Sequence, residues 1–237
     1  MRQIQFSVFL LSFLSIVRGQ NIGDIVERIY QANEQQEKIL QSLYPYSYHQ
    51  EILFQKFDAD DDIDEQSRRK YLVRAVSENT HNRELIEAWN FEDGEWQDVT
   101  EEEKESGLKG EIKKFSLNEM VGPETRNDYL FKLHGNEQLN EYPVFRISVQ
   151  VKEPDDEKFA GELWARRDDF IVIKARLNPS ELPAAVDAMA MEFEMANTSG
   201  YWLPAHARLE AEISFLFFFS GRVKSDIDFY NYDFSSP

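Results

Sequence analysis

The sequence predicts a mainly β (α+β) fold built on one large antiparallel sheet, with helices against one of its faces. Residues 159–234 alternate between apolar and polar side chains, in stretches that are separated only by short turns. Short turns join antiparallel strands, because parallel neighbours need a crossover of about a dozen residues or more. Residues 22–44 form the one long helical pattern, and its single apolar face requires a sheet to pack on.

The chain begins with the features of a secretory signal peptide. Arg2 is followed by the apolar run 6–17 and then by the small residue Gly19. A membrane-spanning helix needs about 20 consecutive apolar residues, so this run is too short for a permanent anchor. We therefore predict a cleaved signal peptide at residues 1–19 and an exported, soluble domain at residues 20–237.

The segment after the signal peptide predicts a long amphipathic helix. Apolar residues from Ile22 to Ile29 follow the i, i+3, i+4, i+7 pattern, and the pattern resumes from Ile39 to Leu43. Pro45 cannot continue a helix and ends this one.

The first half of the sheet is predicted from shorter segments. Strands are expected at 46–57 and 69–77, and two more within 85–96 around a turn at Glu92-Asp93-Gly94. The polar segment 100–117 predicts a solvated helix or excursion, which a capping box formed by Thr100 and Glu103 would begin.

The second half of the sheet shows the clearest period-two alternation. A helical turn is expected at 184–187, and the last hairpin is expected to turn at Ser220-Gly221. In 215–219 (FLFFF) the alternation is lost, which is typical of a strand that is apolar on both faces. The predicted strands are 128–133, 145–152, 159–166, 170–177, 189–196, 201–204, 208–219 and 222–234.

The composition limits how the fold is stabilised and which classes of partner the protein can bind. The chain has no cysteine, so an exported domain has to be stabilised by its core alone. No linker rich in Gly, Ser or Pro interrupts it, which favours one domain, and we expect a monomer. Without Arg2 and Arg18 the chain has 24 basic and 44 acidic residues, a net charge of −20. Such a charge repels nucleic acid and anionic membranes and favours a basic partner.

Motifs for catalysis or metal binding are missing from the sequence. The acidic run 58–64 resembles a calcium loop, but the sixth and twelfth positions hold Ile63 and Arg69 where the loop needs Gly and Glu. We read it as a solvated loop. The four histidines have no metal-ligand spacing, and no nucleophile motif or phosphate loop is present. We therefore expect no enzyme, no cofactor and no metal site.

One strand carries an unusual stripe of methionine. Met189, Met191, Phe193 and Met195 share a face. Such a stripe is most often plain core, but flexible, polarizable methionine also suits a cavity that repacks around apolar ligands. The many aromatic residues, including Phe215 in the last hairpin, exceed what one sheet face and one helix require and favour the cavity.

Several phrases resemble those of a known family. Gly161-Glu162-Leu163-Trp164, the strand 170–175, Trp202-Leu203-Pro204 and the tyrosine-rich 228–234 are similar to sequences of the LolA-like periplasmic lipoprotein carriers, in particular the outer-membrane lipoprotein-sorting subgroup. The Arg-Pro phrase of the family is absent: Arg68-Arg69-Lys70-Tyr71 lacks the proline, so the arginine that latches the family's lid has no clear counterpart.

The resemblance implies a half-open barrel of about ten or eleven strands, with a cavity between its concave face and the covering helices. It implies a periplasmic protein that shields the acyl chain of a lipid or lipoprotein, for sorting or transfer, with envelope membrane proteins as donor or acceptor. The alternatives are a non-catalytic sensor or interaction module with the same fold, or an exported enzyme. The expected lipid-binding residues are Trp164, Met189, Met191, Phe193, Trp202, Phe215 and Phe217 on the sheet, and Ile25 and Ile29 on the helix.

Overall fold

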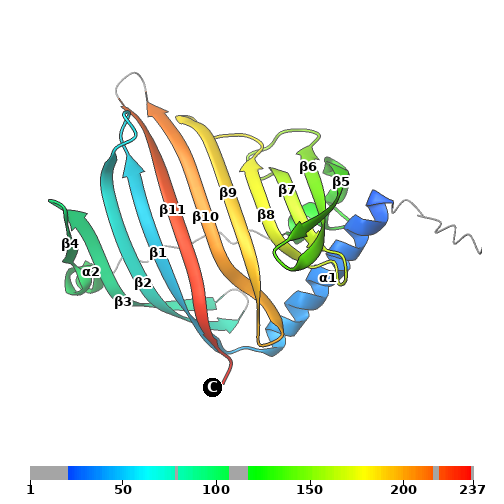
Figure 1. The fold of residues 1–237 in the computed structure, drawn as a ribbon, viewed down its shortest axis with the longest axis horizontal. Coiled ribbons are helices and arrows are strands. Elements are labelled where there is room, and N and C mark those ends of the chain that lie inside the picture. The colour runs from blue at the N-terminus through cyan, green and yellow to red at the C-terminus, as the bar shows by residue number, and fades with distance from the viewer. Residues whose placement is uncertain (1–20, 78–79, 107–116, 216–218, 236–237) are drawn as a thin grey trace, which may run out of the picture.

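The computed structural model describes residues 21–77, 80–106, 117–215 and 219–235 (Figure 1). The predicted signal peptide lies outside these residues. The elements along the chain are α1 (Ile22–Ser42), β1 (Tyr46–Phe57), β2 (Ile63–Ser77), β3 (Thr80–Glu92), β4 (Glu95–Asp98), α2 (Thr100–Ser106), α3 (Asn118–Val121), a 3-10 turn (Arg126–Asp128), β5 (Tyr129–Leu139), β6 (Tyr142–Val151), β7 (Phe159–Arg166), β8 (Val172–Pro179), β9 (Val186–Thr198), β10 (Tyr201–Phe215) and β11 (Phe219–Asp233).

All eleven strands belong to one antiparallel sheet. Their order in space is β4-β3-β2-β1-β11-β10-β9-β8-β7-β6-β5. The first and last strands of the chain are therefore neighbours in the middle of the sheet, where β1 pairs with β11 and Ile52 lies opposite Ile227. β4 and β5 are the two edges and do not pair, so the sheet is not closed into a barrel. The predicted mainly β fold with one large antiparallel sheet is confirmed.

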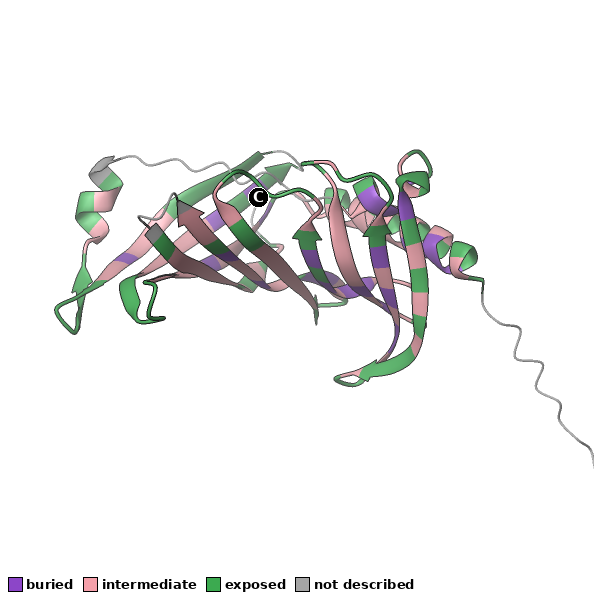
Figure 2. Ribbon diagram, turned by 90° about the horizontal axis from the view of Figure 1, so that it is seen from above, coloured by how far each residue is buried: buried purple, intermediate pink, exposed green. Residues whose placement is uncertain are grey.

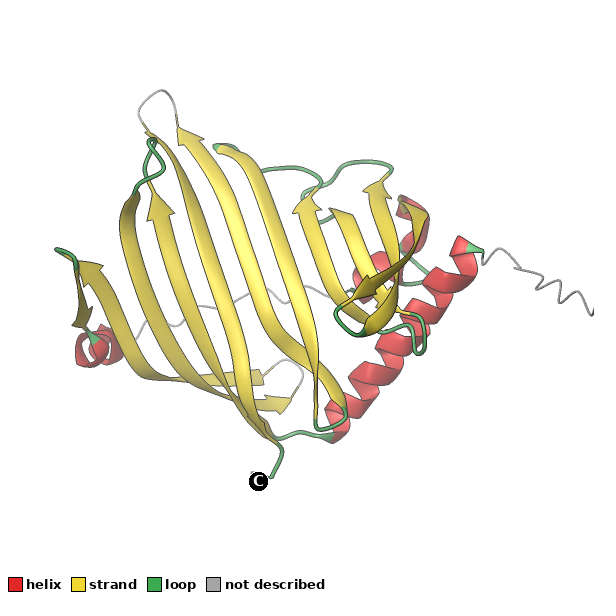
Figure 3. Ribbon diagram, in the orientation of Figure 1, coloured by secondary structure: helices red, strands yellow, loops and turns green. Residues whose placement is uncertain are grey.

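The sheet is curved, and the helices lie on one side of it. Viewed from above, α1 and α2 lie on the same side, at opposite ends of the sheet (Figure 2). α1 runs diagonally beside the shorter strands β5–β8, whereas the long strands of β1–β3 and β9–β11 form the other part of the sheet (Figure 3). The main packing partners of α1 are α3 and β5, and α2 packs on β3.

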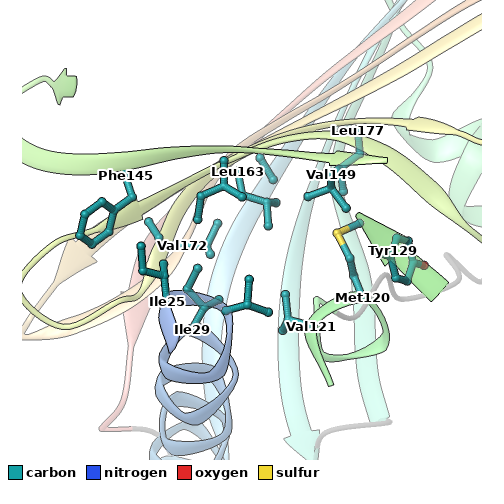
Figure 4. Packing of buried hydrophobic residues seen from close by; sticks show 14 residues of the cluster. Ile25, Ile29, Met120, Val121, Tyr129, Phe145, Val149, Leu163, Val172 and Leu177 are labelled. Carbon is teal, nitrogen blue, oxygen red and sulfur yellow. The ribbon is translucent and has the colours of Figure 1, made fainter. Parts of the chain in front are cut away.

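The hydrophobic core lies between α1, α3 and the strands β5–β8 (Figure 4). Ile25 and Ile29 of α1 are 2% and 0% exposed and belong to the same cluster as Leu163 and Leu177 of the sheet. Burying one such side chain contributes about 1.5–3 kcal/mol, so this cluster is the main source of stability. We call it the helix-covered core; its members are Ile25, Val26, Ile29, Met120, Val121, Tyr129, Phe145, Ile147, Val149, Leu163, Ala165, Val172, Ala175 and Leu177.

The N-terminal helix agrees closely with the sequence pattern. Asn21 caps it, because its Oδ1 accepts a hydrogen bond from the backbone N–H of Gly23 at 3.1 Å. The helix ends at Ser42, two residues before the predicted end, and the chain enters β1 through Pro45.

Four local predictions were wrong, three of them in the second half of the sheet. No helical turn forms at 184–187, because β9 already begins at Val186. Ser220 and Gly221 are part of β11, since the hairpin pairs Phe215 with Phe219. β10 is one strand from Tyr201 to Phe215; the irregularity between Pro204 and His206 lets it pass the proline, which is tolerated at a bulge.

The fourth wrong prediction concerns the start of α2. Thr100 does not form a capping box with Glu103: its Oγ1 accepts a hydrogen bond from the backbone N–H of Ala88 at 2.9 Å. The backbone N–H of Thr100 donates to Asp98 at 2.9 Å, and Glu103 turns towards the sheet. Contacts with β3 and β2 therefore replace the local cap.

Candidate ligand-binding face

The strand register shows which residues share the face of the helix-covered core. Ala175 and Leu177 of β8 belong to that core, and they lie directly opposite Phe193 and Met191 of β9. Side chains directly opposite each other in an antiparallel pair point to the same face. The methionine stripe therefore continues the core face of the sheet towards its middle, with Met189 two residues further along β9.

The same face continues across the three central strands. Opposite Phe193 and Met191 lie Ala207 and Leu209 of β10, and Ala207 lies opposite Ile227 of β11. Ile227 in turn lies opposite Ile52 of β1. We call this surface the open face; it comprises Met189, Met191, Phe193, Ala207, Leu209, Ala211, Val223, Ile227, Ile52 and Phe54.

The open face differs from the helix-covered core in burial. Leu163 and Leu177, under α1 and α3, are 0% exposed. The larger side chains of the open face, such as Met191 and Leu209, are only half-buried, and none of its ten residues belongs to the helix-covered core. Apolar surface left in water costs about 25 cal/mol per Å², so any apolar group that covered this face would be stabilised there.

An aromatic cluster closes one end of the open face, where β1 begins and β11 ends. Tyr48 stacks on Tyr232 with 5.2 Å between ring centroids, and Tyr46 meets Phe234 at 5.7 Å. The Tyr232 hydroxyl donates to the backbone oxygen of Pro204 at 2.7 Å. Burial raises the pKa of Tyr46 and of Tyr232, so both phenols stay neutral.

Helix α2 is fixed to the sheet beyond β1, where it packs on β3. Arg69 of β2 lies opposite Ile52 and Ala88, on the same face. Its guanidinium bonds both oxygens of Glu103 on α2, with Nε to Oε2 at 2.7 Å, and also donates to the backbone oxygen of Trp89 at 2.6 Å. Ala88 beneath it is 0% exposed. The open face thus lies between α1 at one end of the sheet and α2 at the other.

The opposite, outer face of the same strands is charged. Lys174 Nζ lies 3.0 Å from Glu192 and 2.7 Å from Glu194, and Arg208 Nε lies 2.6 Å from Asp226. Burial raises the pKa of Asp226, but hydrogen bonds from Lys224 and Arg208 outweigh it, so its pKa is below the usual value. Such a lattice is typical of a solvated face, which leaves the open face as the apolar side of the central strands.

The structure places five of the nine predicted residues on the face that carries the core. Ile25 and Ile29 lie in the helix-covered core, and Met189, Met191 and Phe193 lie on the open face. Phe215 and Phe217 lie outside the residues whose side chains the structure describes.

The two predicted tryptophans lie outside the helix-covered core. Trp164 follows Leu163, which takes the core position, so its own side chain points outwards; Nε1 lies 3.3 Å from Glu137 Oε2. Trp202 is 4% exposed but belongs to a second cluster with Val144 and Ile173, away from the helix-covered core.

Sequence reasoning missed the contribution of β1 and β11. Ile52 and Phe54 alternate visibly along β1, but only the pairing of β1 with β11 brings them beside Ile227. These residues are about 175 positions apart in the chain, and no local pattern reports such a pairing.

Two depressions among the described residues lie away from the open face. Depressions of about 340 and 450 Å³ lie along α1 and beside α2, and neither is lined by a residue of the open face. Within the described ranges, no group of three or more His, Asp or Glu side chains is placed to hold a metal ion. None of the helices described has the length and hydrophobicity needed to cross a membrane.

Comparison with known proteins finds likeness only at the level of structure. No family model matches the sequence, and no curated protein matches it. A LolA superfamily protein from Nitrosomonas europaea is 14% identical, with a TM-score of 0.33, over 90% of this chain and 93% of that one. A domain from Vibrio parahaemolyticus, named for outer membrane lipoprotein sorting, is 10% identical, with a TM-score of 0.40, over 89% and 94%.

A third similar structure is a complex of two proteins. Pseudomonas aeruginosa MucB, solved with MucA, is 11% identical, with a TM-score of 0.28, over 88% of this chain and 93% of that one. At these identities and scores, the likeness to LolA superfamily structures concerns the general arrangement of sheet and helix and says nothing of a ligand.

Proposed function

We propose that this protein binds the acyl chain of a lipid or lipoprotein on the open face and shields it from water. The observation that carries the proposal is the open face itself: ten apolar residues on four adjacent central strands, outside the helix-covered core. The export signal expected at residues 1–19 would place this activity in the bacterial envelope, as a single monomeric domain over residues 20–237.

The chemistry of the open face suits a flexible apolar chain. Its strands are paired on both sides, so no free backbone edge invites an added strand. Ser225 shares the face, as does Lys56 opposite Val223, and the charge of Lys56 is paired with Asp64. Met189 and Met191 can adapt to chains of different shape. Binding of this kind needs no catalytic group, so we propose a carrier rather than an enzyme.

The energy available is sufficient for reversible binding. A buried methylene contributes about 0.8 kcal/mol, so about ten methylenes contribute about 8 kcal/mol. That free energy corresponds to a Kd of about 1 μM before the costs of ordering the chain are subtracted. A carrier has to release its cargo, and affinity in this range permits release.

Mass spectrometry of organic extracts tests the proposal. The mature protein, purified from an envelope fraction without detergent, is expected to carry lipid that Met191→Gln loses and Ala190→Gln keeps. Both variants add a carboxamide to β9, but Ala190 is on the outer face, opposite Glu210. Absence of lipid from the wild type, together with failure to take up a fluorescent acyl probe, would overturn the proposal.

An interaction module is the second candidate function, and an exposed aromatic pair favours it. Phe91 and Trp96 lie directly opposite each other in the β3–β4 hairpin, at the edge of the sheet, and each is 38% exposed. Residues 92–103 around them include seven acidic residues and no basic one. A basic protein segment with apolar side chains complements this surface.

A basic, leucine-containing peptide tests the second candidate. It is expected to bind the wild type at low salt and to bind Trp96→Ala at least fivefold more weakly. Leu130→Ala removes a comparably exposed apolar side chain at the far edge and serves as the control. Equal binding to all three proteins would exclude the hairpin as the docking surface.

A further inference from the structure

Gln50 is an exception to the composition of the interior. Among the described residues it is the only polar or charged residue in the buried class, at 2% exposed. Its Oε1 atom is buried and has no hydrogen-bond partner. Leaving a buried acceptor unpaired costs about 1–3 kcal/mol, whereas an apolar side chain of the same shape would avoid this cost.

The strand register places Gln50 on the face that we propose as the lipid site. It precedes Ile52 by two residues on β1, in a stretch where the pairing with β2 is regular, so both side chains point to the same side. Tyr71 of β2 and Phe229 of β11 lie directly opposite it. Gln50 therefore lies between the open face and its aromatic end.

Other orphaned polar atoms do not share this position. Those of Asn33 and Asn118 belong to α1 and α3, and that of Arg166 belongs to a side chain held by Tyr142, Trp202 and Asp169. The remaining one is the donor Nε1 of Trp89 on β3, which lies opposite Arg68 and alternates to the outer face. Among the residues that the structure describes, only Gln50 carries an orphaned acceptor on the inner face of the central strands.

We propose that Gln50 accepts a hydrogen bond from the head of the bound chain, so that the ligand class is an acyl chain with an adjoining neutral donor, an amide N–H or a hydroxyl. The proposal rests on the function proposed above. A free carboxylate or phosphate head is disfavoured, because a carbonyl acceptor offers it no proton and the protein has a net charge of −18.

The neighbours of Gln50 permit a ligand to approach. Tyr71 and Phe229 are half-buried, so packing does not enclose their rings on every side. A chain on Ile52 and Ile227 that extends towards the aromatic end would displace one of these rings and bring its donor to Oε1. The tail would then occupy the open face.

Two amides that differ only in the donor provide the test. N-methylpalmitamide has one N–H, and N,N-dimethylpalmitamide has none. Competition against a fluorescent acyl probe is expected to show that wild-type protein binds the first about tenfold more tightly, the gain typical of one buried hydrogen bond. Gln50→Met is expected to bind both equally, and to bind the dimethyl amide as well as the wild type does.

A second glutamine on β1 provides the control for this test. Gln55 alternates to the outer face of β1, so Gln55→Met is expected to keep the tenfold preference. Equal affinity of wild type for the two amides, or a preference that survives in Gln50→Met, would overturn the role of Gln50. The wild-type comparison needs no variant and therefore decides even if Gln50→Met does not fold. If neither amide displaces the probe, the proposed function itself fails.

Discussion

Arg69 on β2 and Glu103 on α2 form a two-pronged ion pair, in which Nε donates to Oε2 at 2.7 Å and Nη2 donates to Oε1. The side chains are 16% and 27% exposed, so the pair is only partly screened by water. It joins β2, the strand beside the open face, to the helix at the far end of the sheet. The contact gives Glu103 a tertiary role in place of the local cap that its spacing from Thr100 predicts.

Breaking this pair is expected to destabilise the protein. Glu103→Gln should lower the free energy of unfolding by about 1–3 kcal/mol, because Arg69 keeps its charge without a partner charge. Arg74→Ala is the control: Arg74 lies on the same strand and pairs with Glu84 at 2.9 Å, but both side chains are more than half exposed. Its effect should stay below about 1 kcal/mol. Equal effects in urea unfolding would contradict the role assigned to Glu103.

Truncating one side chain of α1 in the helix-covered core is expected to lower the free energy of unfolding more than breaking the Arg69–Glu103 pair does. Ile29→Ala is expected to cost about 2–5 kcal/mol, since Ile29 is 0% exposed and its removal leaves a cavity against the sheet. Ile39→Ala, at a half-buried position on the same helix, should cost clearly less. Thermal or urea unfolding measures both, and an Ile29→Ala loss below about 1 kcal/mol would show that α1 is not packed as described.

Gly161, the glycine of the Gly-x-Leu-Trp phrase, is required by close contact between strands. Its φ is +150°, and a Cβ at this position would lie 2.0 Å from the backbone oxygen of Arg176 on β8. Gly161→Ala is therefore expected to cost more than about 2 kcal/mol, because backbone must move. At Gly200, whose φ is +90°, a Cβ would meet nothing within 4 Å. Gly200→Ala should thus be milder, and the reverse order in unfolding experiments would refute this explanation.

Asp226 is expected to make stability fall in acid. Its folded-state pKa is lowered by Lys224 and Arg208 despite burial, so its contribution is fully present above the unfolded aspartate value of about 3.9. The contribution is lost as pH falls through the lower folded-state pKa. The difference in unfolding free energy between wild type and Asp226→Asn should therefore shrink below about pH 4. Urea unfolding from pH 3 to pH 7 measures it, and a constant difference would contradict the assignment.

Local sequence patterns predicted much of the fold because period-two alternation and short turns act on neighbouring residues. They predicted α1 and the antiparallel strands. They also predicted that Met189, Met191 and Phe193 share one face, which the register shows to be the face of the core. They failed where the outcome depends on distant pairing or on a single inserted residue. The β1–β11 contact joins the two ends of the chain, and the irregularity after Pro204 lets β10 continue where the pattern predicts two separate strands.

The burial of Gln50 at the candidate site is likewise something that local sequence patterns cannot predict. A glutamine in the pattern of Tyr48, Gln50 and Ile52 gives no local signal of burial, since glutamine is usually exposed. Only the strands on both sides, which place Tyr71 and Phe229 against it, exclude water from its side chain.

Photo-crosslinking tests most directly whether an acyl chain lies on the open face. A palmitic amide with a diazirine near its tail would be bound to the detergent-free protein, irradiated and mapped by mass spectrometry of peptides. Crosslinks are expected on β9, β10, β11 and β1, with Met191 and Leu209 among them, and Met191→Gln should reduce them while Ala190→Gln does not. Crosslinks confined to the outer face around Trp164, or none above an irradiated control protein, would contradict the account.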